Sequence, residues 1–379
     1  MPSSYLTRNF RHLLDPSASA ILLVLCTVGA LVWANSQWSE SYYSLWHFEL
    51  GAMSLHAIIN DGLMALFFFN VGLEIKRELT VGRLNSVRSA TLPVLAAFGG
   101  MLVPAAIFLY FNRQGAGRPG WGIPMATDIA FALGVLALLG RRISPAVKVL
   151  LTAIAIIDDL GAVLVIAIFY TATLEWSSLA FGLAMLGISL AMNRLGLRRT
   201  LPYFMVGVLV WTFFLQSGIH ATIAGVLLAF TIPATTGDRI EHMLSPVVAL
   251  FIMPLFALSN AGVSLAGSDL THPVAVGVAL GLMVGKPVGI FALAWIGERV
   301  GLAALPSGVR YREVFGLACL GGIGFTMSLF IGGLAYADVE LLQMAILGIF
   351  MASLASGMLG ALVFMLIKPG SPSRIPTRH

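Results

Sequence analysis

Apolar stretches of about 20 residues, the length that crosses a bilayer as an α-helix, alternate with short polar stretches along almost the whole chain. The pattern predicts about twelve transmembrane helices and no separate soluble domain, so residues 1–379 form one integral membrane domain. The predicted segments are residues 18–34, 57–75, 90–111, 121–139, 146–170, 177–193, 201–215, 219–233, 243–265, 274–297, 314–335 and 340–367. The expected fold class is therefore an all-α polytopic membrane protein.

Composition supports this prediction. The 379 residues are 58% hydrophobic and only 10% charged, against about 25% charged residues in soluble domains. Cys26 and Cys319 both lie in apolar segments, so no disulfide framework is expected. The net charge of +5 reflects loop topology in such a protein, and no nucleic-acid partner is predicted.

Lys and Arg residues indicate the orientation of the chain. With a cytoplasmic N-terminus, nineteen of the 22 fall in inner loops and tails, Arg113 and Arg118 fall outside, and Lys286 falls within a segment. Both termini, including the tail at 368–379, are therefore expected in the cytoplasm. Arg8 and Arg11 before the first segment resemble the start of a signal peptide, but the polytopic remainder favours a retained helix.

The first outer loop, about residues 35–56, is the longest predicted outside the membrane. Residues 46–56 roughly alternate apolar and polar side chains about Gly51, which predicts a small periplasmic β-hairpin. An exposed two-stranded ribbon invites pairing with a second copy, so the hairpin is a candidate dimerisation element. A disordered loop is the alternative.

Four ionisable residues lie at membrane depth. They are Asp128 in the fourth segment, the adjacent Asp158 and Asp159 in the fifth, and Lys286 in the tenth. Each charge costs about 3 kcal/mol at the bilayer centre. Three acids against one base leave carboxylates that can exchange a proton for a cation, although a permanently paired buried cluster is the alternative. Adjacent helical residues point about 100° apart, so one aspartate can face an ion cavity while the other turns towards Lys286 or a neighbouring helix.

Two segments carry signals of a broken helix. Pro124 and the pair Thr127 and Asp128 interrupt the fourth segment, and glycines at 321, 322 and 324 interrupt the eleventh. Two interrupted segments in different halves of the chain are typical of a transporter site at the midplane. Asp128 could then balance two positive helix N-termini, and Lys286 either two C-termini or one of the paired aspartates. Close helix packing through small residues is the alternative for the glycines.

A further polar group marks the inner ends of the second and ninth segments. Glu74, Arg77 and Glu78 share a helix face, and Glu241 and His242 open the ninth segment. Histidine titrates near neutral pH, so a pH-responsive mouth is one hypothesis. A surface helix end with salt bridges is the other.

These motifs closely resemble the NhaA family of sodium/proton antiporters, in order and from the first segment to the last. The resemblance rests on VGLEIKREL at 71–79, TDIAFALGVLALLG at 127–140, AIIDDLGA at 155–162, LFALSNAGV at 255–263, GKP at 285–287 and GGIGFTMS at 321–328.

The resemblance implies an electrogenic antiporter of the bacterial inner membrane that expels Na⁺ or Li⁺ in exchange for protons and serves pH homeostasis and salt tolerance. It also implies inverted repeats, crossing broken fourth and eleventh helices, and a homodimer joined through the hairpin. Asp158 and Asp159 match the family's ion-binding and proton-carrying pair, while Thr127, Asp128 and Lys286 match the supporting positions. Glu74, Arg77, Glu78, Glu241 and His242 match its pH-responsive funnel.

The chain departs from the family in that funnel. Residues 235–239 form a short, barely basic inner loop where the family often has a longer basic one. Ser245 stands where a second histidine of the family can occur. The pH response is therefore the least secure implication.

The predicted mechanism is competition between a dehydrated cation and protons for the carboxylates of Asp158 and Asp159, without a cofactor or enzymatic activity. One alternative is another proton- or cation-coupled carrier, for which we find no aromatic cluster beside the aspartates. Another is an intramembrane aspartyl protease, but the Gly-x-Gly-Asp motif is absent. A channel is disfavoured because bare carboxylates would hold the ion too tightly.

Overall fold

The computed structural model describes residues 16–82, 84–171, 174–264 and 269–367. Within these ranges, ten helices are long and apolar enough to cross a membrane, and the bent pair α16 (Tyr311–Gly321) and α17 (Phe325–Ala335) forms an eleventh span. The shorter apolar helix α11 (Ala221–Thr231) corresponds to the eighth predicted segment. The all-α polytopic prediction is confirmed. The tail at 368–379 lies outside the described residues.

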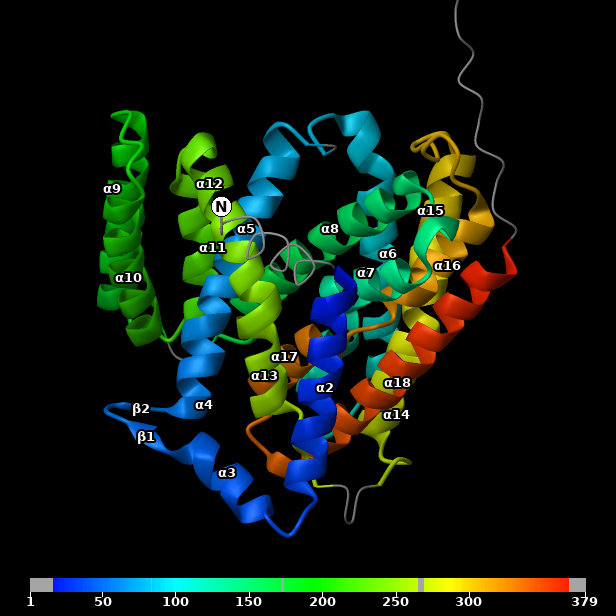
Figure 1. Cartoon of the computed structure of the whole chain (residues 1–379), viewed down its shortest axis with the longest axis horizontal. Helices are drawn as coiled ribbons and strands as arrows, with labels where there is room; N and C mark the ends of the chain where they lie inside the picture. The colour runs from blue at the N-terminus through cyan, green and yellow to red at the C-terminus, as the bar shows by residue number, and fades with distance from the viewer. Residues whose placement is uncertain (1–15, 83, 172–173, 265–268, 368–379) are drawn as a thin grey trace, which may run out of the picture.

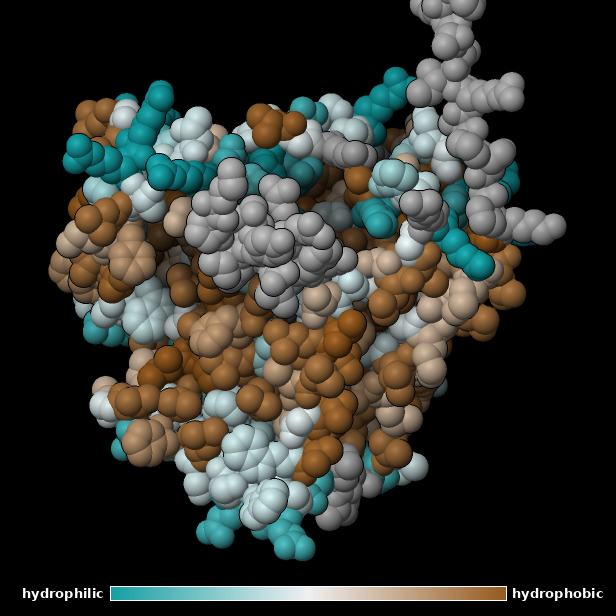
Figure 2. All heavy atoms as spheres, viewed as in Figure 1, coloured by the Kyte–Doolittle hydropathy of each residue, from teal (hydrophilic) through white to brown (hydrophobic). Residues whose placement is uncertain are grey.

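The helices form a bundle (Figure 1). Hydrophobic residues gather in a band around the middle, and hydrophilic ones lie towards the two ends (Figure 2). The other helices of the bundle are α2 (Pro16–Ala34), α5 (Met64–Thr80), α6 (Val87–Phe111), α7 (Ile129–Leu138), α8 (Pro145–Phe169), α9 (Trp176–Arg194), α10 (Thr200–Ser217), α12 (Ala234–Val247), α13 (Met253–Asn260), α14 (Pro273–Leu280), α15 (Lys286–Arg299) and α18 (Val339–Leu366).

Three spans contain a π-helical stretch, which the hydrophobic pattern did not predict. The stretch η1 (Ile58–Leu63) follows the single turn α4 (Leu55–Ala57), η4 (Val248–Ile252) joins α12 to α13, and η5 (Gly281–Gly285) joins α14 to α15. π-Helical stretches are rare in proteins overall, but many of those that occur lie at functional sites. The prediction of a loop at 235–239 is wrong, because these residues form the first turns of α12 after Pro233.

The predicted hairpin is present. Strands β1 (Glu49–Leu50) and β2 (Met53–Ser54) pair antiparallel, with Glu49 opposite Ser54. Gly51 occupies the turn with φ of +72°, which glycine adopts without strain. The helix α3 (Ser39–His47) fills the rest of the loop and buries Tyr42 and Trp46, a feature that the alternating pattern missed. We call the end of the molecule with α3, β1 and β2, at the bottom of Figure 1, the hairpin face.

Close contact between α6 and α15 fixes the position of Lys286. Gly99 and Gly289 meet at the crossing, where a Cβ on either residue would collide with the backbone of the other. Small residues that let two backbones approach are typical of helix contacts in membranes. This contact holds the first turn of α15, which begins at Lys286, against α6.

Candidate functional site

The fourth segment is interrupted at 126–128, as predicted. The preceding half is the 3₁₀ helix η2 (Arg118–Met125), which contains Pro124, and the following half is α7. Asp128 is the N-cap of α7, with extended backbone, and its Oδ1 accepts a hydrogen bond of 2.9 Å from Phe131 N. The Asp side chain therefore satisfies a backbone donor that the interruption exposes.

The eleventh segment is interrupted between α16 and α17, and its two halves are bent by 43°. No side chain of α17 caps its own N-terminus. Instead, Phe325 N donates to Ser353 Oγ of α18 at 3.2 Å. At Gly322 a Cβ would lie 2.5 Å from both Leu282 O and Ser356 Oγ, so this position requires glycine for close packing.

The two interruptions are joined directly by hydrogen bonds. Asp128 N donates to Ile323 O at 2.7 Å, and Thr127 Oγ1 donates to Gly321 O at 2.9 Å. Asp128 Oδ2 accepts hydrogen bonds from Thr326, from N at 3.2 Å and from Oγ1. One carboxylate thus faces the positive N-termini of both α7 and α17, where a negative charge is stabilised.

Lys286 is completely buried and is paired. Its Nζ forms an ion pair with Asp158 and donates to Thr127 Oγ1 at 2.8 Å. Because Thr127 in turn donates to Gly321 O, Lys286 reaches the C-terminal end of α16 through a hydroxyl rather than directly. The sequence left several possible partners for Lys286, and in the structure its partner is Asp158.

Asp159 has no such partner. Its side chain is 2% exposed, and its Oδ1 makes no hydrogen bond to any described residue. Oδ1 of Asp158 is unpartnered in the same way. Asp159 interacts electrostatically with Asp158, Glu74 and Asp128, which repel its charge, and with Lys286, which attracts it. Thr127, Asp128, Asp158, Asp159 and Lys286 are called the midplane cluster below.

Unpartnered carboxylate oxygens in a buried site can accept a proton or coordinate a hard cation, which prefers oxygen ligands. The described residues contain no group of three or more His, Cys, Asp or Glu side chains that could hold a resident metal ion. The available donors are two carboxylates and a hydroxyl beside unwound backbone. This set suits an ion that binds and leaves.

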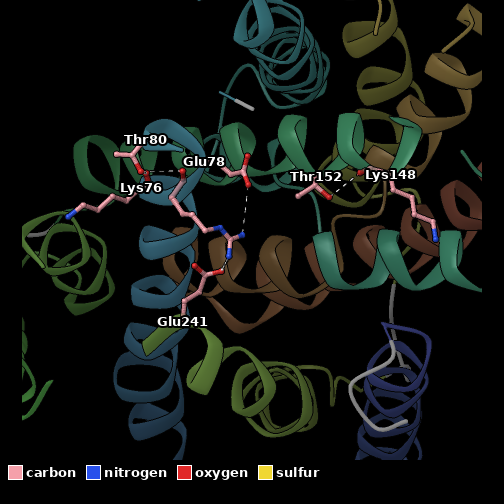
Figure 3. Close-up of polar contacts among 7 residues, drawn as sticks. Lys76, Glu78, Thr80, Lys148, Thr152 and Glu241 are labelled. Carbon is pink, nitrogen blue, oxygen red and sulfur yellow. Dashed lines mark hydrogen bonds and ion pairs between the residues drawn. The ribbon is translucent and has the colours of Figure 1, made fainter. Parts of the chain in front are cut away.

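A second cluster lies where the end of α5 meets α12, at the end of the bundle away from the hairpin face (Figure 1). Figure 3 shows Glu78 and Glu241 of this cluster. Arg77 pairs with the buried Glu241 of α12, and its Nη2 lies 3.9 Å from Glu78 Oε1. Glu74 interacts electrostatically with Glu241, Arg77 and Glu78, and also with Asp159. Glu74, Arg77, Glu78 and Glu241 are called the mouth cluster, which Glu74 couples to the midplane cluster.

His242 is more exposed than the residues of the mouth cluster. It is exposed, next to the buried Glu241. Ser245 links neighbouring helices: its Oγ donates to Asn70 Oδ1 of α5 at 3.1 Å or to Glu241 O of its own helix at 2.8 Å. The funnel residues of the sequence analysis are thus brought together, except that His242 faces outward.

Sequence reasoning missed two residues of this site. Thr326 lies inside the motif at 321–328 but was not selected, although a hydroxyl directly after a broken helix is a signal for capping. Ser353 carried no signal, because a serine among small apolar residues also suits ordinary helix packing. Only the fold shows that it meets the N-terminus of α17.

A polytopic helical bundle with two broken helices joined beside buried charges defines a secondary transporter. The comparisons with known proteins agree with this class. Residues 11–364 match the family described as Na⁺/H⁺ antiporter 1. Curated relatives include the Na⁺/H⁺ antiporter NhaA 2 of Pseudomonas syringae pv. syringae, 49% identical over 95% of this chain and 94% of the relative.

Two more relatives carry the same name without a number. The NhaA antiporter of Koribacter versatilis is 45% identical over 92% of this chain and 89% of its own. The NhaA antiporter of Flavobacterium psychrophilum is 46% identical over 90% of this chain and 92% of its own. The chain therefore belongs to the Na⁺/H⁺ antiporter 1 family. It is a transporter rather than an enzyme, so the protease alternative is wrong.

Proposed function

We propose that this protein exports Na⁺ or Li⁺ across the bacterial inner membrane in electrogenic exchange for protons, with Asp159 and Asp158 as the shared binding groups. The observation that carries the proposal is the unpartnered, buried carboxylate oxygen on each aspartate. A buried oxygen without a donor is costly unless a proton or a cation occupies it during the cycle.

Asp159 is the first ligand of the cation in this proposal. Deprotonated Asp159 would accept a dehydrated ion together with Asp158 Oδ1 and the Thr127 hydroxyl, which lies in the same cluster. Protons arriving from the other side neutralise the same oxygens and displace the ion. An empty site with bare carboxylates should resist passage through apolar surroundings, which makes exchange obligatory.

Lys286 is the second candidate proton carrier. A cation bound to Asp158 weakens the Lys286–Asp158 pair, and an unpaired buried ammonium then favours loss of its proton. If Lys286 and Asp159 each carry a proton against one cation, one positive charge moves per turnover. The exchange is then electrogenic.

The hairpin face is assigned to the periplasm and the mouth cluster to the cytoplasm. Support comes from the Lys and Arg distribution, since inner loops are rich in these residues. Both termini would then be cytoplasmic, and the hairpin would be free to pair with a second copy in a homodimer. Glu74, Arg77, Glu78 and Glu241, with His242 at their edge, would set the pH response of the inner mouth.

The proposal is tested with purified protein in proteoliposomes. A pH gradient should drive Na⁺ and Li⁺ exchange by the wild-type protein, and choline should not be exchanged. Asp159→Asn should abolish the exchange, whereas Asp269→Asn should keep it. This is the same change at an exposed loop residue whose carboxylate accepts hydrogen bonds from Thr271. Full exchange by Asp159→Asn would refute the proposed site.

A further inference from the structure

A cavity of about 350 Å³ lies at the hairpin face, apart from both clusters. Residues of α3, η1, α13, α17 and α18 line it. None of the described lining residues is Asp, Glu, Lys or Arg. The cavity wall is mostly apolar, with aliphatic and aromatic side chains, and its polar groups are side-chain amides, hydroxyls and two histidines. This combination distinguishes it from the charged midplane cluster.

A compact group of amides and a histidine forms the polar wall of the cavity. Asn260 Nδ2 donates to Asn60 Oδ1 at 3.0 Å, and Asn60 Nδ2 lies 3.3 Å from Asn260 Oδ1. His56 Nε2 lies 3.2 Å from Asn260 Oδ1, and Asn260 Nδ2 also donates to Ser259 Oγ at 2.7 Å. Side-chain amide oxygens are good ligands for hard cations.

The end of α13 adds negative potential to this wall. Asn260 is the last residue of α13, whose span runs from Ala234 to Asn260. The C-terminus of a helix carries roughly half a negative charge. Tyr42 Oη holds this end by donating to Leu258 O at 2.8 Å or Ser259 O at 3.2 Å. A cation in the cavity would therefore be attracted without meeting a carboxylate.

About one turn of α17 connects the cavity to the midplane cluster. Phe330 of α17 lines the cavity, and Thr326, four residues earlier, bonds Asp128. Four residues of α-helix span about 6 Å. The Phe330 ring lies 5.3 Å from Phe68 and 6.2 Å from Phe256, measured between ring centroids. The rings of Phe256 and Phe330 line the cavity, and Phe68 packs against Phe330.

The backbone that presents Asn60 is unusual. Asn60 lies in the π-helical stretch η1, and the π-helical stretch η5 ends immediately before Lys286. An inserted residue of this kind redirects the side chains that follow, and such stretches are frequent at functional sites. One π-helical stretch therefore contains the cavity-lining Asn60, and another directly precedes the buried Lys286.

We infer that the amide pair Asn60–Asn260 is a second, transient cation site, which holds Na⁺ or Li⁺ at the hairpin face between the midplane cluster and the periplasm. This inference rests on the proposed exchange. The amide pair opens to present its two oxygens to the ion, with Ser259 Oγ beside them. Because the site lacks a carboxylate, it binds weakly, as an exit must if the ion is to leave.

The experiment compares the two sides of the membrane. In right-side-out vesicles, Na⁺ uptake driven by an outward proton gradient reports the apparent KM at the hairpin face, and inside-out vesicles report the other face. Asn260→Ala removes one ligand and should raise the outer KM about tenfold, the effect of about 1.4 kcal/mol. The inner KM should stay within about twofold. Gln343 lines the same cavity from α18, and Gln343→Ala should leave both values unchanged.

A second readout does not depend on the activity of the Asn260 variant. A side chain added at Gly333, which lines the cavity, meets no atom within 4 Å. In a background with Cys26→Ser and Cys319→Ser, Gly333→Cys should react with a membrane-impermeant thiol reagent from outside. Na⁺ should slow this reaction relative to choline, and Asn260→Ala should remove the protection.

The outcomes separate this inference from the proposed function. Equal KM shifts on both sides, no shift at all, or labelling that is identical in Na⁺ and choline would each overturn the second site while wild-type exchange remained. Absence of exchange by the wild-type protein would instead overturn the proposed function.

Discussion

Two ion pairs of similar chemistry lie at different depths of the molecule. The pair Lys286–Asp158 is completely buried, with side chains 0% and 1% exposed, whereas Arg77 in the pair Arg77–Glu241 is 31% exposed. The buried pair lies beside an unpartnered aspartate and a broken helix. The pair at the mouth joins the last turn of α5 to the middle of α12, and Figure 3 shows Glu241 of this pair.

The difference teaches what each pair can do. Breaking a buried pair leaves an uncompensated charge, which costs several kcal/mol, so its protonation state is tightly coupled to whatever binds nearby. A pair that water reaches is worth little and responds gradually. We therefore expect the buried pair to take part in exchange and the mouth pair to adjust access to it.

Lys286→Ala is expected to have the largest effect on stability and transport, because it breaks the buried ion pair. Asp158 would lose its only basic partner among the described residues, which should destabilise the protein by about 3 kcal/mol and reduce the charge moved per turnover. Thermal unfolding in detergent and current measurements on supported membranes report the two effects. The double variant Lys286→Ala with Asp158→Asn should recover stability but not charge movement. Unchanged charge movement in Lys286→Ala would exclude Lys286 as a proton carrier.

A smaller loss is expected from Gly289→Ala, which acts on the buried pair through the backbone. The added methyl group would collide with Gly99 and push the start of α15 away from α6, at a cost of about 1–3 kcal/mol. The apparent KM for Na⁺ should rise because Lys286 moves with the helix. Gly187→Ala on α9, where a Cβ meets nothing within 4 Å, is the matched control. Equal unfolding temperatures for the two variants would contradict the proposed packing.

Glu241→Gln tests the mouth pair. Freed from its partner, the Arg77 guanidinium would repel cations at the mouth, so the inner KM for Na⁺ should rise with little change in kcat. The stability loss should stay below about 1 kcal/mol, because Arg77 is partly solvated. Glu78→Gln, at 3.9 Å from Arg77, should change the KM less. A fall in kcat as large as that of Lys286→Ala would remove the distinction between the two pairs.

The smallest effect concerns an exposed carboxylate that serves neither pair. Glu175 caps α9, and hydrogen bonds from Ser177 and Ser178 lower the pKa of this carboxyl group from 4.5 to about 2. Because the folded pKa is the lower one, the stabilisation is present above about pH 4.5 and is lost as the pH falls towards 2. The unfolding temperature of Glu175→Gln should lie slightly below that of the wild type at pH 7. The two values should converge in acid, and a constant difference would contradict the capping role.

The sequence predicted the elements whose signal is local. Among the described residues, ten helices and the bent pair α16–α17 confirm eleven predicted segments as spans, while the eighth is the shorter apolar helix α11. The breaks near Asp128 and at 321–324 are also present, because apolar length and helix-breaking residues act within one segment. It did not predict α3, since Tyr42 and Trp46 become buried only against other parts of the fold. It also missed the π-helical stretches, which no residue pattern marks.

The partners within the site depended on tertiary structure. Four charges at one depth were visible in the sequence, but which aspartate meets Lys286 depends on the crossing of α6 with α15 and the rotation of α8. Ser353 is the clearest case, because its hydrogen bond joins α18 to the N-terminus of α17, 28 residues earlier in the chain. The roles of Asp158 and Asp159 in exchange remain a prediction of the sequence and the geometry.

The central claim is that a cation and a proton compete for the Asp159 carboxylate. The most direct measurement adds Na⁺ to the purified protein in weakly buffered detergent solution and follows proton release with a pH indicator. The account predicts saturable release from the wild-type protein and loss of that release in Asp159→Asn. Saturable Na⁺ binding by the wild type without proton release, or full release from Asp159→Asn, would contradict it.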